Sequence, residues 1–346
     1  MLACYDSHTP LIPALHQPAL LADLVQEHGV DPAAWLAASG VPAAALLTQP
    51  RAISPAEWLR LMAHAGRLLA APDTAFVYGR RLLPGHHGAA SHALQQAGCL
   101  LDALQTLVRH TTRLSPLLTP RLLVERDEVL LVWRDAVGLG AQRAWVVDMA
   151  MAAVAAMAEW LGGQPLPWTF CFNRTAPRRV EQHQAYLGTA LRFGCHVDGM
   201  VLPREHLERP WPRATQPGAA QARQAAERAA AHEAGQEPTP TTSLLGALHQ
   251  HLQTHLHQAP SLEGAAQALG TSAATLKRRL AAEGTHFQAE LDLARGEMAL
   301  YLFRYRHADN GDVAQALGFH DVPNFRRAFK RWAGQTPQGL RLALAL

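Results

Sequence analysis

Residues 313–334 read VAQALGFHDVPNFRRAFKRWAG, and residues 265–270 begin a second copy of the same pattern with AAQALG. In each copy an apolar helical pattern stops at a glycine, and another helical stretch follows after a few residues. A small residue at the crossing point of two helices lets them approach closely, and glycine releases the chain into a turn. The repeat therefore predicts two helix-turn-helix units, at about residues 261–284 and 310–334.

The second helix of each unit has a basic face. TLKRRLAAEG (275–284) aligns with NFRRAFKRWAG (324–334), so that Arg278 matches Arg327 in the repeat. Cations on an exposed helix face can bind DNA phosphates and the acceptor-rich edge of guanine in the major groove. One basic helix is most often only a solvated face. Two such helices in register, with the same apolar positions, predict a DNA-binding module.

The segment between the units, residues 285–306, has the pattern of an amphipathic connecting helix. About 18 residues at about 1.5 Å each span roughly 27 Å. With the flanking turns, this length approaches the roughly 34 Å of one duplex turn, so one chain could set two recognition helices into successive major grooves. The residues expected to face inward are Phe287, Leu291, Ala294, Met298 and Leu302.

Length and charge agree with a two-domain protein. The chain has 346 residues, of which 49% are hydrophobic and 17% charged, with a net charge of +3. Residues 1–260 carry 20 basic and 20 acidic side chains, and residues 261–346 carry 11 and 8. The basic excess therefore lies in the part that has the repeat, as expected of a polyanion-binding end.

The cysteines indicate a reduced environment. The four of them are scattered without a C-x-x-C pair, which argues against a zinc site of the usual spacing and against a disulfide framework. The N-terminus lacks the pattern of a signal peptide, so we expect a cytoplasmic protein. The cysteines are Cys4, Cys99, Cys171 and Cys195.

Residues 144–163 are long enough to cross a membrane. Asp148 and Glu159 interrupt the segment, and most of its apolar positions are alanine. A carboxylate near the middle of a bilayer costs roughly 3 kcal/mol, and alanine offsets little of it. We therefore expect a buried helix of a soluble domain and no membrane partner.

The first 210 residues predict an α+β domain. Ser54 and Pro55 form a helix start signal before AEWLRLMAHAGRLLA. The other expected elements are helices within 13–70, a loop at 80–88, a helical stretch at 90–115, a β-hairpin at 121–133, a helix at 141–161, a strand at 167–173 and two short strands around Gly199 within 191–202.

From about residue 212 the composition shifts to Ala, Gln, Pro and Thr. AAQARQAAERAAAHEA can form a solvated helix, and GQEPTPTT reads as a linker. The predicted organisation is an effector-binding and dimerisation domain at 1–212, a linker at 213–242 and an all-α double helix-turn-helix domain at 243–346.

The C-terminal part resembles the DNA-binding domain of AraC/XylS-type transcription regulators, from about Leu244 to Leu342. The most specific stretch is GFHDVPNFRRAFKRWAGQTPQGLR (318–341), which includes the closing pattern around Thr336-Pro337. The N-terminal part is similar to the arabinose-binding-like effector domain of one branch of this family. This similarity rests on the stretches LVQEHGVDPAAWLAASGV, RAISPAEWLRLMAHAGRLL, RRLLPGHHG and LRFGCHVDGMVLPREHLERP.

The resemblance implies a cytoplasmic, homodimeric regulator that binds double-stranded DNA, senses a small molecule of unknown identity and contacts RNA polymerase. It implies no cofactor. A constitutive regulator, whose N-terminal domain only dimerises, is the alternative. A DNA-repair enzyme carrying the same module is less favoured, because its chemistry needs a clustered, zinc-held cysteine set. The sequence also has no catalytic motif, so we do not expect an enzyme.

The resemblance also assigns DNA-contacting positions. Four departures from the family matter. Asn310 replaces an apolar residue, so we expect its helix to start late, and Gly264 lies inside the leading helix of the first unit, where glycine costs about 1 kcal/mol relative to alanine. Pro323 donates no hydrogen bond, and Arg326 adds a cation. Arg278 and Arg327 are therefore the preferred specificity residues. The implied base-reading residues are Ala274, Lys277 and Arg278 in the first unit and Pro323, Asn324 and Arg327 in the second; Arg279, Arg326, Lys330 and Arg331 complete the DNA-binding set.

Histidines provide further candidates, each with a plainer alternative. His86 and His87, in the Gly-flanked loop, suit an effector pocket, although an exposed turn is favoured. His251 and His255 are spaced for one helix face, but no third metal ligand is evident. Redox sensing at Cys195, next to His196, has little support, since no basic neighbour is evident in the sequence.

Overall fold

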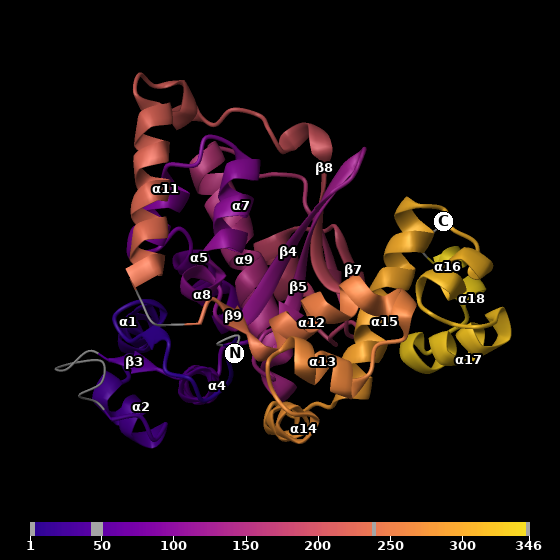
Figure 1. The fold of residues 1–346 in the computed structure, drawn as a ribbon. Helices are drawn as coiled ribbons and strands as arrows, with labels where there is room; N and C mark the ends of the chain where they lie inside the picture. The colour runs from indigo at the N-terminus through magenta and orange to yellow at the C-terminus, as the bar shows by residue number, and fades with distance from the viewer. Residues whose placement is uncertain (1–3, 43–50, 237–239, 344–346) are drawn as a thin grey trace. The chain divides into compact units, whose positions relative to one another are not determined.

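The structure is a computed structural model that describes residues 4–42, 51–236 and 240–343 (Figure 1). The chain divides into two compact units. The larger comprises Tyr5–Thr241, and the smaller comprises Thr242–Leu346 together with Met1–Cys4. The short strands β1 (Cys4–Tyr5) and β9 (Thr242–Ser243) lie where the chain passes from one unit to the other.

The larger unit is built around a five-stranded sheet of order β4-β5-β8-β6-β7. All its pairings are antiparallel except that of β6 with β7, which is parallel. The predicted hairpin is confirmed, because β4 pairs with β5 over the full length of β4. The strands are β4 (Leu118–Val124), β5 (Glu128–Asp135), β6 (Thr169–Phe172), β7 (Leu191–Phe193) and β8 (Asp198–Pro203).

The two short strands expected around Gly199 are present, but Gly199 does not separate them, because it lies inside β8, opposite Val132 of β5. The break between the last two strands comes earlier, at Gly194, whose φ of 70° is a left-handed conformation that glycine adopts without steric cost. The pattern around residues 191–202 indicated two strands correctly but placed the turn at the wrong glycine.

Helices complete the larger unit, and their starts follow local sequence signals. The expected cap is confirmed, because Ser54 and Glu57 form a capping box at the start of α4. Residues 90–115 are mostly helical, as predicted, and form three short helices. The helices are α1 (Gln17–Glu27), α2 (Pro32–Ala38), α4 (Pro55–Leu69), α5 (Thr74–Leu82), α6 (Ala89–Gln95), α7 (Leu100–Arg109), α8 (Thr111–Leu114), α9 (Arg143–Gly162), α10 (Glu181–Leu187) and α11 (Ala219–Gln236); β2 (Ile12–Pro13) and β3 (Ala52–Ile53) form a separate two-stranded sheet.

The apolar segment that passes the length test for a membrane span is α9. Among the described residues it is the one helix of sufficient length and hydropathy, and 67% of its apolar window is buried inside the protein. It packs against α5, where Gly79 lets the backbones approach closely: a Cβ there would lie 2.3 Å from the carbonyl oxygen of Met149. As predicted, α9 is a buried core helix.

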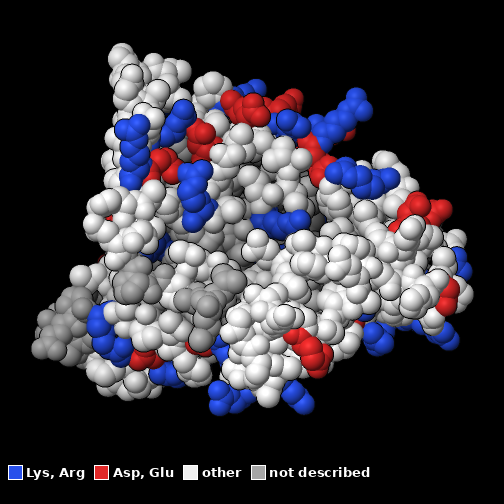
Figure 2. Space-filling view, in the orientation of Figure 1, with Lys and Arg blue, Asp and Glu red and all other residues white. Residues whose placement is uncertain are grey.

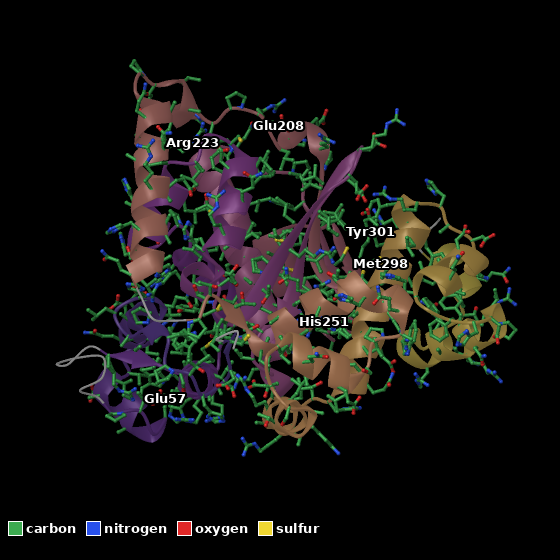
Figure 3. All side chains as sticks on the ribbon, in the orientation of Figure 1. Glu57, Glu208, Arg223, His251, Met298 and Tyr301 are labelled. Atoms are coloured by element: carbon green, nitrogen blue, oxygen red, sulfur yellow. The ribbon has the colours of Figure 1, made fainter. Side chains whose placement is uncertain are left out.

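Helix α11 lies in the segment assigned to the linker, but it is not fully solvated. Ala226 and Ala230 are buried against Ala93 of α6. Polar contacts add to this small apolar patch: the guanidinium of Arg223 lies 2.5 Å from the carboxylate of Asp102 on α7 (Figure 3). The helix therefore belongs structurally to the larger unit.

The smaller unit is all helical apart from β9. Its core is made mainly of leucine, alanine and phenylalanine side chains, among them the buried Leu276, Leu280, Phe325 and Phe329. The helices are α12 (Leu244–His255), α13 (Leu262–Ala268), α14 (Ala273–Ala282), α15 (Phe287–Tyr305), α16 (Asn310–Ala316), α17 (Val322–Ala333) and α18 (Pro337–Ala343). The fold class is thus α+β followed by a helical domain, as predicted.

Candidate nucleic-acid interface

The first helix pair consists of α13 and α14. The hydroxyl of Ser272 caps α14 by accepting a hydrogen bond from the amide of Thr275 at 3.2 Å. With Leu276 and Leu280 buried, the opposite face of α14 is exposed and carries Ala274, Lys277 and Arg278. The side chains that the sequence assigns to base reading therefore lie on the solvent face of this helix.

Arg279 differs from its neighbours. It is half-buried, and its Nη2 donates a hydrogen bond to the carbonyl oxygen of Cys4 at 3.2 Å, within the same unit. This contact ties the start of the chain to α14. Its role in the fold competes with the predicted DNA contact, so Lys277 and Arg278 are the better candidates on α14.

The second helix pair consists of α16 and α17. Asp309 caps α16 through a capping box with Asp312, and the helix begins at Asn310. The expected late start of this helix is therefore wrong, because the preceding Asp309 caps the helix at Asn310.

The N-terminus of α17 is held by a chain of polar contacts. The carboxylate of Asp321 accepts hydrogen bonds from the backbone amide of Asn324 and from its side-chain amide, both at 2.6 Å. The side-chain oxygen of Asn324 in turn accepts a hydrogen bond from the guanidinium of Arg327. Pro323 lies in the first turn, where its missing N–H leaves no helix hydrogen bond unmade.

This chain orders two of the predicted base-reading residues, Asn324 and Arg327, before any DNA is bound. Both are exposed, as are Pro323 and Arg326. Sequence reasoning missed Asp321, although an aspartate three residues before an asparagine at a helix start is a recognisable capping signal.

The remaining cations of α17 fall into two kinds. Arg331 forms an ion pair with Asp292 of α15 at 3.1 Å, although its side chain remains 63% exposed. Arg326 and Lys330 are exposed and form no ion pair within the part of the chain that the structure describes. Lys330 and Arg326 are therefore the stronger phosphate-binding candidates, since Arg331 is already partly neutralised.

Figure 2 shows Lys and Arg side chains projecting from the lower edge of the smaller unit, beneath both α14 and α17. The connecting helix α15 has 19 residues, which correspond to about 28 Å at about 1.5 Å per residue. Its buried side chains include Leu291 and Ala294, as predicted, and also Ala299 and Phe303, which the predicted stripe omitted. A helix of this length is compatible with the expected spacing of two major-groove contacts.

The two candidate effector residues of the larger unit do not lie together at a surface. His86 is exposed, whereas His87 is fully buried and its Nε2 donates to the carbonyl oxygen of Leu82 at 2.8 Å. Burial lowers the pKa of His87 from 6.5 to about 4, so its ring is neutral at physiological pH. Its Nδ1 has no hydrogen-bond partner among the described residues.

The other histidine candidates, His251 and His255, lie on α12. The rings of His251 and His255 stack with centroids 4.4 Å apart, and Nδ1 of His255 bonds to the carbonyl oxygen of His251 instead of pointing to an open site (Figure 3 labels His251). No group of three or more metal-ligating side chains occurs among the described residues.

An all-helical unit with two helix-turn-helix pairs, each with an exposed basic second helix, defines a DNA-binding transcription regulator. Two family models match the chain. The arabinose-binding domain of AraC transcription regulators, N-terminal, matches residues 29–211, and the helix-turn-helix domain matches residues 265–343. The chain belongs to the AraC family of transcription regulators.

Curated relatives agree with this assignment. The chain is 29% identical to the ornithine utilization regulator of Pseudomonas aeruginosa over 334 residues, covering 96% of this chain and 97% of that protein. It is 34% identical to the regulator VqsM of the same species over 101 residues, covering 28% of this chain and 31% of VqsM. The first relative is named a regulator and the second a transcriptional regulator of the helix-turn-helix type.

Among solved structures, the regulator CdpR of Pseudomonas aeruginosa matches 89% of this chain and 96% of its own, with 22% identity and a TM-score of 0.39.

Proposed function

We propose that the protein is a sequence-specific regulator that reads its operator through α14 and α17 and responds to a small molecule bound in the larger unit. The proposed reading of the operator rests on Arg327 of α17, which is exposed and already held by a hydrogen bond within the helix. Its counterpart in the repeat, Arg278 of α14, is exposed as well. A cytoplasmic location, a homodimer and contact with RNA polymerase belong to the same proposal.

The reading residues are tested by Arg278→Ala and Arg327→Ala, with footprinting first used to define an operator upstream of neighbouring genes. Loss of a bidentate guanine contact costs about 1–3 kcal/mol of discrimination per site. Both side chains are exposed, so both variants are expected to keep the unfolding temperature of the wild type. Wild-type discrimination in both variants would contradict the assignment.

The effector part of the proposal rests on an apolar cavity in the larger unit. It lies next to Leu82 and Leu83, which begin the loop that contains His87, and reaches α9 at Met149. Trp133 on β5 also lines it. Trp133 is 2% exposed, and its indole N–H has no hydrogen-bond partner among the described residues. An apolar cavity with one N–H donor that lacks a partner suits an apolar ligand with a single hydrogen-bond acceptor.

The cavity has a volume of about 20 Å³, which is about the space that one water molecule needs. A larger effector must therefore displace side chains of the lining helices. Binding of such an effector would therefore change the structure around the cavity. An effector shifts a protein between two arrangements only if its affinity for the two differs. The open and closed forms of this cavity are the two arrangements in this proposal.

A thermal-shift screen tests the effector. The panel contains L-ornithine and L-arabinose, chosen from the names of the relative and of the domain model, together with apolar carboxylic acids and amides. A ligand at 100 times its dissociation constant adds about 2.7 kcal/mol to the stability of the unit that binds it. Trp133→Phe removes the indole N–H but keeps an aromatic ring; this variant is expected to weaken a hit by about 1 kcal/mol. A ligand that stabilises the wild type and Trp133→Phe equally would bind outside this cavity.

The alternative is a constitutive regulator whose larger unit only dimerises. Trp160, which is 59% exposed, is an apolar side chain that a dimer interface would cover. Sedimentation of the wild type and of Trp160→Glu tests this interface, since the variant would become monomeric; the ligand screen separates the two ideas. A dimer with no hit in the panel would favour the alternative.

Regulation through the linker provides a further test. If the larger unit acts on DNA binding by domain placement or dimer geometry, residues 243–346 alone should bind the operator, only more weakly than the full chain. A folded fragment without any operator affinity would contradict this mechanism.

A further inference from the structure

Two cysteines that are far apart in the sequence meet at one edge of the large sheet. Cys171 lies on β6, and Cys195 follows β7, the strand that pairs with β6 in parallel. The chain reverses at Gly194, and the amide of Cys195 then donates to the carbonyl oxygen of Phe172 at 3.0 Å. Cys195 is thus hydrogen-bonded to the residue that directly follows Cys171.

The two thiols contact each other in a side-chain hydrogen bond. In β6 the neighbours Phe170 and Phe172 are buried, whereas Cys171 is only partly buried, as expected for alternate residues on opposite faces of a sheet. Cys195 is also partly exposed. Both sulfurs are therefore close to one another and within reach of small solutes.

Cys195 has the properties of an attacking thiol. The hydrogen bond from Cys171 is the largest of the effects that lower its pKa from 9.0 to about 7; the amide at Phe172 and the charge of Arg192 act in the same direction, against burial and Asp198. Burial raises the pKa of the Cys4 and Cys99 thiols. At pH 7.5 a thiol with a pKa of about 7 is about three-quarters ionised, against about 3% for an ordinary one.

We propose that Cys171 and Cys195 form a peroxide-reactive dithiol that closes to an intramolecular disulfide. The Cys195 thiolate attacks one oxygen of a hydroperoxide, the O–O bond breaks, and hydroxide or alkoxide leaves, which gives a sulfenic acid at Cys195. The Cys171 sulfur then attacks the sulfenic sulfur, and water leaves. In total two thiols lose two electrons and two protons, and the hydroperoxide is reduced to water or to an alcohol and water.

The disulfide would form beside a buried polar cluster. Arg174, three residues after Cys171, contacts the carboxylate of Asp148 on α9 and donates to Nε2 of His183 on α10 at 2.8 Å. Its carbonyl oxygen accepts a hydrogen bond from the amide of Gly194 at 2.8 Å, next to Cys195. The cross-link would therefore join two segments that already hold α9 and α10 to the edge of the sheet.

The test uses the reduced full chain, treated with one equivalent of hydrogen peroxide at pH 7.5, quenched with N-ethylmaleimide and mapped by peptide mass spectrometry. Of the four free thiols, two are expected to disappear, with a disulfide that links Cys171 to Cys195. A larger fraction of Cys195 is thiolate, which favours its reaction, whereas the lower basicity of that thiolate makes it less nucleophilic. The net expectation is that Cys195 reacts with peroxide at least about three-fold faster than Cys99. Equal rates at all cysteines, or a disulfide between other partners, would overturn the proposal.

Three serine variants separate the roles. Cys171→Ser should stop at a sulfenic acid on Cys195 that dimedone traps, and Cys195→Ser should leave Cys171 reduced at the same peroxide dose. Cys99→Ser is the matched control and should still lose two thiols. Dimedone labelling of Cys171 in the Cys195→Ser variant, at the wild-type rate, would contradict the assignment of the attacking sulfur.

Phenylarsine oxide gives a readout that needs no variant. Its trivalent arsenic bonds two neighbouring thiolates and releases one water. One arsenic per chain is expected, with Cys171 and Cys195 protected from N-ethylmaleimide and Cys4 and Cys99 still labelled. Labelling of all four cysteines in the presence of the arsenical would show that the two sulfurs are not close enough to act together.

Discussion

The side-chain oxygen of Asn324 accepts a hydrogen bond from the guanidinium of Arg327, one turn further along the second recognition helix. The amide nitrogen of Asn324 is held by Asp321 at 2.6 Å, so the contact is fixed from both sides. A recognition side chain that is ordered before binding loses less rotamer entropy when it meets DNA. If Arg327 reads a base, as proposed, this order lowers the entropy cost of that contact.

Asn324→Ala should weaken discrimination between the operator and a variant operator by about 1 kcal/mol, the value of one net hydrogen bond. Stability should change little, because Asp321 still caps the helix through the backbone amide at residue 324. Competition binding and thermal unfolding measure the two effects. Unchanged discrimination would mean that Arg327 needs no support from Asn324.

Lys330 and Arg331 should differ in their effect on the salt dependence of DNA binding. Lys330→Ala is expected to reduce the slope of log K against log salt concentration by about 1, since each phosphate contact releases counterions. Arg331→Ala should reduce it by less, because Asp292 lies 3.1 Å from its guanidinium. In an Asp292→Asn background, Arg331→Ala should reduce the slope as much as Lys330→Ala does. Equal slopes for the two alanine variants would contradict this ranking.

Ala230→Glu should release α11 from the larger unit, whereas Ala229→Glu should not. Ala230 is 2% exposed and packs against Ala93, while Ala229 faces solvent. An unpaired carboxylate in that contact should cost at least about 2 kcal/mol of local stability. Hydrogen exchange over residues 219–236 measures the release. The large core belongs to a separate cluster and should keep its protection.

If α11 were equally protected from hydrogen exchange in the two glutamate variants, its polar contacts alone would be enough to hold it on the larger unit. These include Glu227, which accepts from the hydroxyl of Thr106 at 2.7 Å, and Glu233, which accepts from the amide of Ala89 at 2.8 Å.

His87 should make the larger unit less stable in acid. Its pKa is about 4 in the folded protein, below the 6.5 of an unfolded histidine, because burial penalises the charged ring. The unfolded chain therefore binds more protons between these values, and stability is fully present above pH 6.5 and falls as the pH drops toward 4. The loss is at most about 3 kcal/mol from this residue.

Denaturant unfolding at pH 7.5 and pH 4.5 measures this effect, and His87→Gln is the comparison, because glutamine keeps an N–H donor but does not titrate in this range. The variant should lose less stability on acidification than the wild type. His16, whose ring centroid lies 5.6 Å from that of His87 and whose pKa burial also lowers, should account for part of the remaining slope. An identical slope in both proteins would contradict the burial effect.

The sequence by itself determined the features that depend on neighbours along the chain. The repeat at residues 265 and 313, the helix start at Ser54 and the hairpin predicted at residues 121–133 follow from helical period, cap residues and strand alternation, which act over a few residues. The basic positions Arg278 and Arg327 could be read for the same reason.

Only the tertiary structure decided which distant residues meet. It buried His87 and exposed His86, paired Arg331 with Asp292, docked α11 through Ala230 and brought Cys171 to Cys195. None of these contacts leaves a periodic signal, because each joins segments whose separation along the chain is set by the whole fold. Their chemistry depends on burial and on partners that the local sequence does not specify.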